Sequence, residues 1–216
     1  MSLIVLKKIK KEYGKNQVLF NDLSLEIDQG EFVGLIGKSG AGKTTLLNII
    51  GLITDISAGT ITIGNYKNLS MKSKNAMLLR RHTIGYLFQN YGLVEDESVL
   101  WNLKLALEYK RISKGEKSRK INKYLKQFGL GDMLNKKIYQ LSGGEQQRVA
   151  IIKLILQGSK IILADEPTSG LDKDNEATVM SLLKKLNESG VTIIMVTHNL
   201  NLCDYFSRVI DVEKYR

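Results

Sequence analysis

The glycine-rich segment at residues 34–45 constrains the fold of this chain more than any other feature of its sequence. It reads Gly-Leu-Ile-Gly-Lys-Ser-Gly-Ala-Gly-Lys-Thr-Thr, begins within an apolar run at 31–36 and leads into a helix-favouring run at 46–51. Glycines allow successive backbone N–H groups to turn inward, and the start of the following helix offers unpaired N–H groups and a positive dipole end to an anion. The segment therefore predicts a strand, a loop and a helix that together bind phosphate oxygens.

The same segment matches the Walker A pattern of nucleotide-binding loops. Lys43 is expected to reach the β- and γ-phosphates, and the Thr44 hydroxyl to bind the Mg²⁺ that bridges them. A glycine-rich turn with no ligand is the alternative, but an accidental match to so long a pattern is rare in a chain of this length. The nucleotide-binding residues predicted here are Gly37, Lys38, Ser39, Gly40, Ala41, Gly42, Lys43, Thr44 and Thr45.

A second apolar run ends in two adjacent carboxylates, Asp165 and Glu166, just before the only proline of the chain. The carboxyl ends of strands line the ligand crevice in open α/β sheets. We therefore expect Asp165 to hold Mg²⁺, commonly through water, and Glu166 to polarise the water that attacks the γ-phosphate. A simple turn before Pro167 explains this segment equally well on its own. The phosphate-binding segment elsewhere in the chain favours the catalytic interpretation.

Two consecutive glycines, Gly143 and Gly144, stand at a predicted helix start. Ser142 and Glu145 have the spacing of a capping box, which accounts for the helix start without any ligand. It does not account for the glycines, because each costs roughly 1 kcal/mol relative to alanine in a helix. They predict a close approach to the backbone by another group. An anionic ligand at this helix N-terminus would make the segment a second phosphate contact.

Strand-like apolar runs alternate with helical patterns along the later part of the chain, which predicts an α/β fold with a largely parallel sheet. The charged segment 95–139 contains no convincing strand and is predicted to be a helical insertion. Residues 175–188 carry an apolar stripe at i, i+3, i+4 and i+7 that predicts a core-facing helix, formed by Val179, Leu182, Leu183 and Leu186. With no linker or repeat, residues 1–216 are predicted to form one domain. The predicted strands are 3–6, 31–36, 59–63, 161–164 and 191–196.

The formal net charge of +10 raises the question of a nucleic-acid partner. The basic residues are 25 Lys and 7 Arg, however, and bidentate recognition of bases favours Arg. We therefore predict no specific nucleic acid. Nine basic residues and only two acidic ones lie within 104–126. They form either a solvated helix face or a surface attracted to anionic lipid.

Three features bear on where the chain resides. No apolar run reaches the roughly 20 residues that span a bilayer, no signal-peptide pattern opens the sequence, and Cys203 is the single cysteine. We expect a chain that does not cross a membrane by itself and that resides in the reducing cytoplasm.

In their order along nearly the whole chain, these motifs resemble those of the ATP-binding cassette (ABC) ATPases. Residues 141–148 are similar to the signature motif of that family, 161–166 to its Walker B motif and 169–172 to its D-loop. The resemblance implies a P-loop NTPase fold of the ABC ATPase type. It also implies an N-terminal antiparallel β-subdomain and a helical subdomain at approximately 90–145.

The resemblance further implies roles that the residues alone do not assign. Taken singly, three residues also have ordinary interpretations: Tyr13 as a surface or core tyrosine, Gln89 as a loop residue and His198 as a histidine at a strand end. The implied nucleotide contacts are Tyr13, stacked on adenine, and Val18; the implied catalytic residues are Glu166 as general base, His198 at the γ-phosphate and Gln89 of the Q-loop, which joins Thr44 and Asp165 at the magnesium.

In ABC ATPases the signature motif of one subunit completes the ATP site of another. The resemblance therefore implies that Ser142, Gly143 and Gly144 act on the ATP of a second subunit, in a homodimer or with a partner cassette. Residues 79–93 and 141–150 look most like the ATPase subunits of macrolide-exporter and lipoprotein-releasing systems, a group that includes some bacteriocin exporters.

That resemblance implies an ATPase that powers a separate membrane permease, which exports a peptide, a lipoprotein or a hydrophobic compound, and that lies peripherally on the inner face of the cell membrane. The alternatives are a soluble ABC ATPase that acts on ribosomes or DNA, and a P-loop kinase or other small NTPase. The signature motif argues against the kinase. The absence of a second cassette or a long heptad insertion argues against the soluble class.

Overall fold

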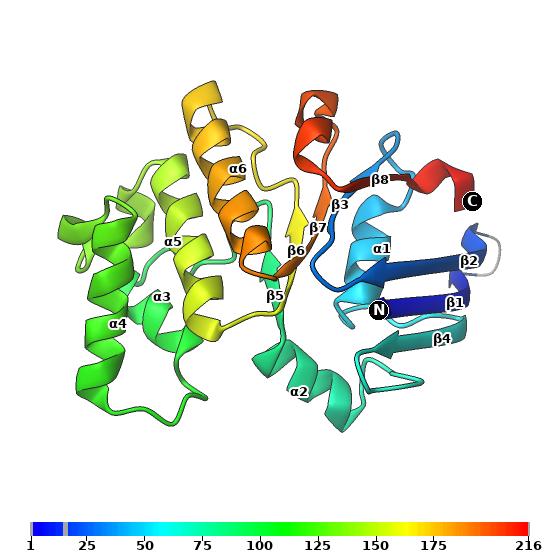
Figure 1. Cartoon of the computed structure of the whole chain (residues 1–216), viewed down its shortest axis with the longest axis horizontal. Coiled ribbons are helices and arrows are strands. Elements are labelled where there is room, and N and C mark those ends of the chain that lie inside the picture. The colour runs from blue at the N-terminus through cyan, green and yellow to red at the C-terminus, as the bar shows by residue number, and fades with distance from the viewer. Residues whose placement is uncertain (1, 15–16, 216) are drawn as a thin grey trace.

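The computed structural model describes residues 2–14 and 17–215, and it contains two β-sheets and helices that cover both faces of the larger sheet (Figure 1). The first sheet has three antiparallel strands in the order β2-β1-β4: β1 is Ser2–Tyr13, β2 is Gln17–Asp28 and β4 is Ala58–Ile63. The second has five parallel strands in the order β5-β6-β7-β3-β8: β3 is Phe32–Ile36, β5 is Ile84–Leu87, β6 is Ile161–Asp165, β7 is Thr192–Val196 and β8 is Arg208–Asp211.

All five predicted strands are present, as β1, β3, β4, β6 and β7, although β3 and β7 each begin one residue later than predicted. The parallel sheet and the N-terminal antiparallel sheet confirm the predicted fold class. Three strands were not predicted from the sequence: β2, β5 and β8. Strand β2 contains Asn and Asp residues that are depleted in strands, whereas β5 and β8 have only four residues each. Their patterns are therefore too short or too polar to be recognised alone.

Six α-helices are found among the described residues. They are α1 Lys43–Ile50, α2 Lys74–His82, α3 Val99–Ala106, α4 Lys114–Gln127, α5 Gly143–Gln157 and α6 Lys173–Glu188. Short 3₁₀ turns follow at Gly131–Met133, Ile138–Gln140, Leu200–Tyr205 and Val212–Tyr215. The predicted stripe of α6 packs into the core, with Val179 and Leu183 buried. No helix in the described part of the chain is long and apolar enough to cross a membrane.

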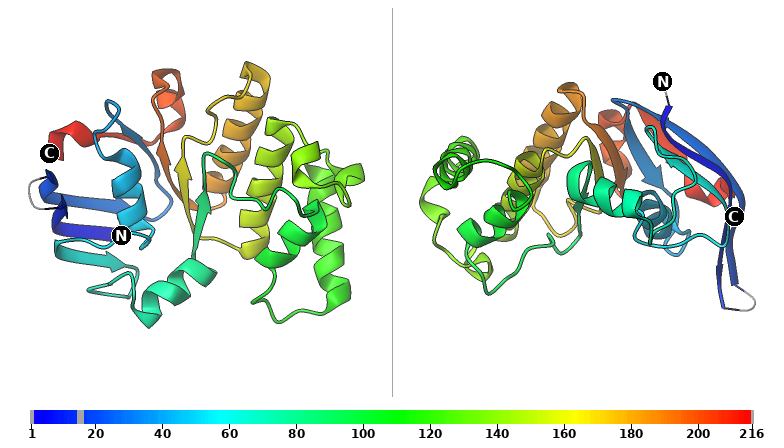
Figure 2. Two further views of the ribbon diagram at one scale, coloured as in Figure 1. Left: turned by 180° about the vertical axis from the view of Figure 1, so that it is seen from behind. Right: turned by 90° about the horizontal axis from the view of Figure 1, so that it is seen from below.

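Three hydrophobic clusters divide the interior. The first surrounds α1, which packs between the antiparallel sheet and one face of the parallel sheet. The second joins the opposite face of the parallel sheet to α5 and α6, and the third joins α3, α4 and α5 to one another. Figure 2 shows this third group of helices at the opposite end of the molecule from the antiparallel sheet. The segment predicted as a helical insertion therefore has a core of its own, built around α5.

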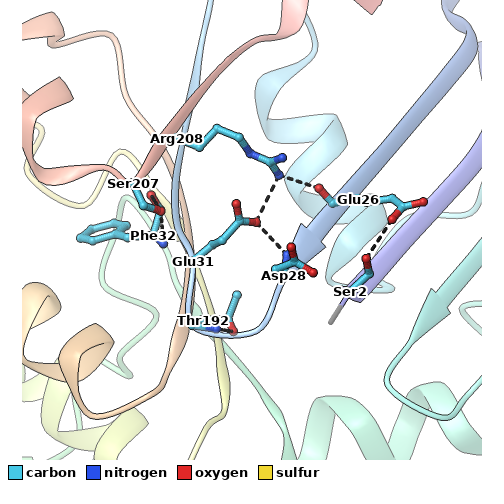
Figure 3. Close-up of polar contacts among 9 residues, drawn as sticks. Ser2, Glu26, Asp28, Glu31, Phe32, Thr192, Ser207 and Arg208 are labelled. Atoms are coloured by element: carbon cyan, nitrogen blue, oxygen red, sulfur yellow. Dashed lines mark hydrogen bonds and ion pairs between the residues drawn. The ribbon is translucent and has the colours of Figure 1, made fainter.

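A polar network holds the turn that leads from β2 into β3 (Figure 3). Arg208 donates to the Glu26 carbonyl at 2.5 Å and pairs with the Glu31 carboxylate at 3.2 Å. The same carboxylate accepts from the Asp28 N–H at 2.7 Å. The N–H of Phe32 donates to the Ser207 hydroxyl at 2.9 Å. These bonds fix the start of β3, the strand that ends at the glycine-rich loop.

Asn102 on α3 anchors the segment that follows β5. Its side chain is fully buried, accepts from the Val94 N–H at 2.8 Å, and donates to the carbonyls of Val94 and Ser98 at 3.1 Å each. The side chain therefore satisfies main-chain groups that the irregular segment 94–98 cannot satisfy by itself.

Replacing Asn102 with alanine is expected to lower the free energy of unfolding by about 2–4 kcal/mol, because buried main-chain groups lose their partners. For a chain of this size that corresponds to a fall in Tm of roughly 5–15 °C. Scanning calorimetry measures it, with the exposed Asn122→Ala on α4 as the matched control. Equal Tm values for the two variants would contradict the anchoring role.

Candidate functional site

The glycine-rich loop turns at the end of β3 and feeds directly into α1. Gly40 and Gly42 have φ angles of 78° and 95°, a region that side chains with a Cβ rarely adopt. A Cβ at Gly42 would also lie 2.8 Å from the ring of Phe20. No side chain caps the start of α1 among the described residues. The first N–H groups of this helix are therefore free to bind an anion, as the sequence predicts.

Lys43 places its ammonium group inside this loop. The residue is only 8% exposed, and Nζ donates to the carbonyls of Gly37 at 2.7 Å and Lys38 at 2.9 Å. Both bonds bend the loop around the ammonium group. Its positive charge lies beside the helix N-terminus, where the two reinforce each other in attracting phosphate.

A cavity of about 480 Å³ opens beside the loop and gathers half of the predicted site residues. Tyr13 comes from the end of β1, and its hydroxyl lies 3.3 Å from that of Thr45. Leu19 on β2 also lines the cavity but was not predicted, because no motif contains it. Val18, which was predicted, is 48% exposed and does not line it. The lining residues are Tyr13, Leu19, Ser39, Gly40, Gly42, Lys43, Thr44, Thr45, Glu166 and His198.

The carboxylate of Asp165, at the end of β6, lies next to the loop. The Thr44 hydroxyl donates to it at 3.1 Å. Burial raises the pKa of Asp165 above its usual value, in spite of the bond from Thr44. The Tyr86 hydroxyl on neighbouring β5 also has a raised pKa, through burial and the negative charge of Asp165. A desolvated carboxylate beside a hydroxyl oxygen is a pair that a cation would stabilise.

Glu166 turns out of β6 toward the neighbouring strand. Its φ of 46° is in the left-handed region, which is unusual for a residue with a side chain, and its N–H donates to the Val196 carbonyl at 3.1 Å. The carboxylate lies 3.2 Å from His198 Nδ1, with the side chains 25% and 67% exposed, respectively. The ends of β6 and β7 thus bring the two predicted catalytic residues together at the cavity.

Gln89 does not reach this cavity in the described conformation. It lies in the loop after β5 and is exposed. The loop is tied to α5, because Lys153 on that helix donates to the Gly92 carbonyl at 2.9 Å. The resemblance to ABC ATPases implies a role for Gln89 at the magnesium. It does not give the position of the loop, which depends on contacts with α5.

The predicted helix start at Ser142 is confirmed in detail. The Glu145 N–H donates to the Ser142 hydroxyl at 3.3 Å, and the Ser142 N–H donates to the Glu145 carboxylate at 2.7 Å. The predicted close approach to the glycines is confirmed as well, but the approaching groups belong to this chain. A Cβ at Gly143 would lie 2.8 Å from the Tyr91 hydroxyl, and one at Gly144 would overlap the amide of Asn175. A ligand is therefore not needed to explain the glycines, and none of the three residues 142–144 lines the cavity.

The pKa of Lys153 is lowered by burial, which gives a pH-dependent prediction. The folded chain binds this proton less tightly than the unfolded chain does, so the charge opposes folding at neutral pH. That opposition fades as the pH rises through the lowered pKa toward the ordinary value of 10.5. We therefore expect the wild type to gain stability relative to Lys153→Met between pH 7 and pH 10. Urea unfolding at each pH measures this difference, and the exposed Lys126→Met serves as the control for the loss of one lysine. A constant difference for Lys153→Met would contradict the assignment.

A strand, a glycine-rich loop and a helix, with a carboxylate pair on a nearby strand, define a P-loop nucleotide-binding protein. The family described as ABC transporter matches residues 20–169. A protein from Methanocaldococcus jannaschii named an uncharacterized ABC transporter ATP-binding protein, MJ1508, is 40% identical over 96% of this chain and 94% of its own length. The macrolide export ATP-binding/permease protein MacB of Campylobacter jejuni is 41% identical over 98% of this chain, which spans 33% of that relative's length.

A solved structure supports the same assignment. The ATP-binding cassette MJ0796, in a dimeric post-hydrolysis state bound to ADP and Pi, superposes with a TM-score of 0.86 at 35% identity, over 97% of this chain and 95% of the other. The present chain belongs to the ABC transporter family. It is an ATP-binding, ATP-hydrolysing cassette, as its motifs predict.

Proposed function

We propose that this cassette powers a separate membrane permease, which exports a peptide, a lipoprotein or a hydrophobic compound. The observation that carries the proposal is the cavity that gathers the glycine-rich loop, Glu166 and His198 but not the signature residues. Such a site requires a second subunit, and closure of two subunits around ATP is a movement that a permease can use. The MacB relatives are named ATP-binding/permease proteins, and this chain matches one third of the length of the first of them. That match supports a permease as the other part of the system.

In the proposed reaction, ATP lies in the cavity with its phosphates on the N–H groups at the start of α1. Tyr13 stacks on the adenine, with Val18 near it. Glu166 accepts a proton from the attacking water, whose oxygen bonds to the γ-phosphorus as the bond to the bridging oxygen of ADP breaks. His198, held by Glu166, contacts the γ-phosphate. The positive φ of Glu166 supports this role, because strained backbone conformations cluster at functional sites.

The residues next to the loop fit a magnesium ion. The Thr44 hydroxyl and the Asp165 carboxylate are hard oxygen ligands 3.1 Å apart, and the described residues contain no group of three or more His, Cys, Asp or Glu residues that would form a metal cage. Mg²⁺ bound with nucleotide commonly uses only one or two protein ligands. When bound, the ion neutralises charge on the phosphates. We propose Thr44 and Asp165 as the protein ligands of the ion. Gln89 would join them after its loop moves.

We propose that two copies of this chain form the working unit. Ser142, Gly143 and Gly144 would contact the ATP of the second copy, since they do not line the cavity of their own. The dimeric state of the MJ0796 cassette supports this arrangement. We propose that residues 1–216 form one cassette with a helical subdomain at approximately 90–145, which the separate hydrophobic cluster of α3, α4 and α5 supports.

The assembly would lie on the inner face of the cell membrane, where the basic residues of 104–126 could meet anionic lipid. Lys114, Arg119, Lys120 and Lys123 on α4 are exposed. Each basic residue near an anionic leaflet contributes about 1 kcal/mol. We expect binding to phosphatidylserine vesicles that weakens as salt rises from 50 to 500 mM, measured by co-sedimentation. Neutral phosphatidylcholine vesicles are the control, and binding that ignores salt would count against this orientation.

Co-purification tests the proposed function. The tagged chain is isolated from detergent-solubilised membranes of its own cells, and the recovered proteins are identified by mass spectrometry. We expect a protein with several apolar spans of roughly 20 residues. Recovery with ribosomes or DNA, or from the cytosol alone with no membrane protein, would overturn the proposal.

A further inference from the structure

Gln147 on α5 is fully buried, yet neither polar atom of its amide has a hydrogen-bond partner among the described residues. A buried amide without partners is unfavourable, and nearly all such groups in folded proteins are bonded. An apolar residue of similar size would fill the same space without this cost. The presence of glutamine therefore points to a bond that Gln147 makes in another state of the protein.

The helix geometry indicates where that bond is made. Residues four apart share a helix face, and side chains lean toward the helix N-terminus. The Gln147 side chain therefore lies over the turn at Gly143 and Gly144, which have no side chains of their own. Three groups approach these glycines, namely the Tyr91 hydroxyl, the Leu171 side chain and the Asn175 amide.

Only one of these groups is available to Gln147. Leu171 is apolar. The Asn175 amide already donates to the Asp172 carboxylate at 2.7 Å and accepts from Arg148 at 3.3 Å. No described residue forms a hydrogen bond with the hydroxyl of Tyr91. This hydroxyl can both donate to and accept from an amide.

Tyr91 also belongs to the loop that has to move. Its φ of 64° and that of Gly92, 62°, place two consecutive residues in the left-handed region, and for a tyrosine that conformation is strained. Gln89, two residues earlier in the same loop, is exposed and outside the ATP cavity. The Tyr91 N–H bonds to the Phe88 carbonyl at 2.9 Å, so a shift of the tyrosine moves the turn that carries Gln89.

We propose that Gln147 is a positioning residue for ATP hydrolysis. In the nucleotide-bound dimer its amide bonds to the Tyr91 hydroxyl, and this bond holds the loop 88–92 with Gln89 facing the cavity. A bond that is made in only one of two states favours that state. In the described conformation this bond is open, and the amide of Gln147 has no partner among the described residues. The inference rests on the proposed roles of Gln89 and of the dimer.

Two conservative substitutions test the bond. Gln147→Met keeps the unbranched shape and removes the amide, and Tyr91→Phe removes only the hydroxyl. We expect each to lower kcat for ATP about five- to tenfold, the effect of losing one buried hydrogen bond, with KM unchanged because neither side chain lines the cavity. The double variant should be no slower than either single variant. Tyr66→Phe, which alters a tyrosine far from α5 in sequence, should match the wild type.

The Tm of the nucleotide-free protein separates positioning from ordinary packing. Gln147→Met should leave this Tm unchanged or raise it, because the buried amide has no partner to lose in the described conformation. A lowered Tm, an unchanged kcat, or independent losses that multiply in the double variant would each overturn the inference. If the wild type itself hydrolyses no ATP under any condition, the ATPase assignment fails instead. If the wild type hydrolyses ATP and both variants are as active as the wild type, only the inference about Gln147 is wrong.

Discussion

Glu166→Gln is expected to bind ATP as the wild type does but to hydrolyse it about 10²–10⁴ times more slowly. The amide keeps the size of the side chain, yet it cannot accept a proton from the attacking water, and a general base contributes about this factor. The carboxylate lines the cavity and lies 3.2 Å from His198, so its replacement removes the base without removing the phosphate-binding loop.

Phosphate release at saturating ATP measures the rate, and a fluorescent ATP analogue measures the affinity. Since ATP would persist between two subunits, the variant should also accumulate ATP-dependent dimers, seen by size-exclusion chromatography with light scattering. Glu188→Gln, at the exposed end of α6, is the matched control and should behave as the wild type. Unchanged turnover in Glu166→Gln would refute the role of general base.

Lys43→Ala is expected to abolish the stabilisation of the protein by ATP. Ligand at about 100 times its Kd stabilises a protein by about 2.7 kcal/mol, which raises the Tm of a chain of this size by roughly 5–10 °C. The ammonium group of Lys43 lies within the loop that binds the phosphates, 2.7 Å from the Gly37 carbonyl. Without it the loop loses both its charge and the bonds that shape it, so the Tm rise should vanish.

Differential scanning fluorimetry with and without MgATP measures this shift. Lys67→Ala, an exposed lysine outside the cavity, should retain the full rise in Tm. The Tm of Lys43→Ala without nucleotide serves as a check that the variant is folded. An undiminished ATP-induced rise in a folded Lys43→Ala would refute the role assigned to this lysine.

Contiguous motifs made most of the site predictable. Lys43 and Thr44 follow a strand and open a helix, and Glu166 and His198 follow strands that are adjacent in one parallel sheet. Parallel strands bring their carboxyl ends to the same edge, so local sequence was sufficient to predict Lys43, Thr44 and Glu166 in one site, whereas His198 was implied only by the resemblance to ABC ATPases. The strand pattern and the apolar stripe of α6 were predictable for a similar reason, since each depends on a local periodicity.

Contacts between distant residues could not be predicted in this way. Leu19 lines the cavity only because β2 pairs with β1 and brings it over the loop. The glycines at the start of α5 indicated a phosphate contact, whereas Tyr91 and Asn175 are what approach them. The position of Gln89 outside the cavity depends on the fold of its loop against α5. Such features arise from tertiary packing, which leaves no periodic trace in the sequence.

If one subunit holds only part of an ATPase site, the rate of hydrolysis per subunit must depend on dimer formation. Phosphate release is followed at saturating MgATP while the concentration of the protein is varied over at least two orders of magnitude. We expect the rate per subunit to rise with concentration and to level off once analytical ultracentrifugation finds dimers. A rate per subunit that stays constant down to concentrations at which the protein is entirely monomeric would contradict it.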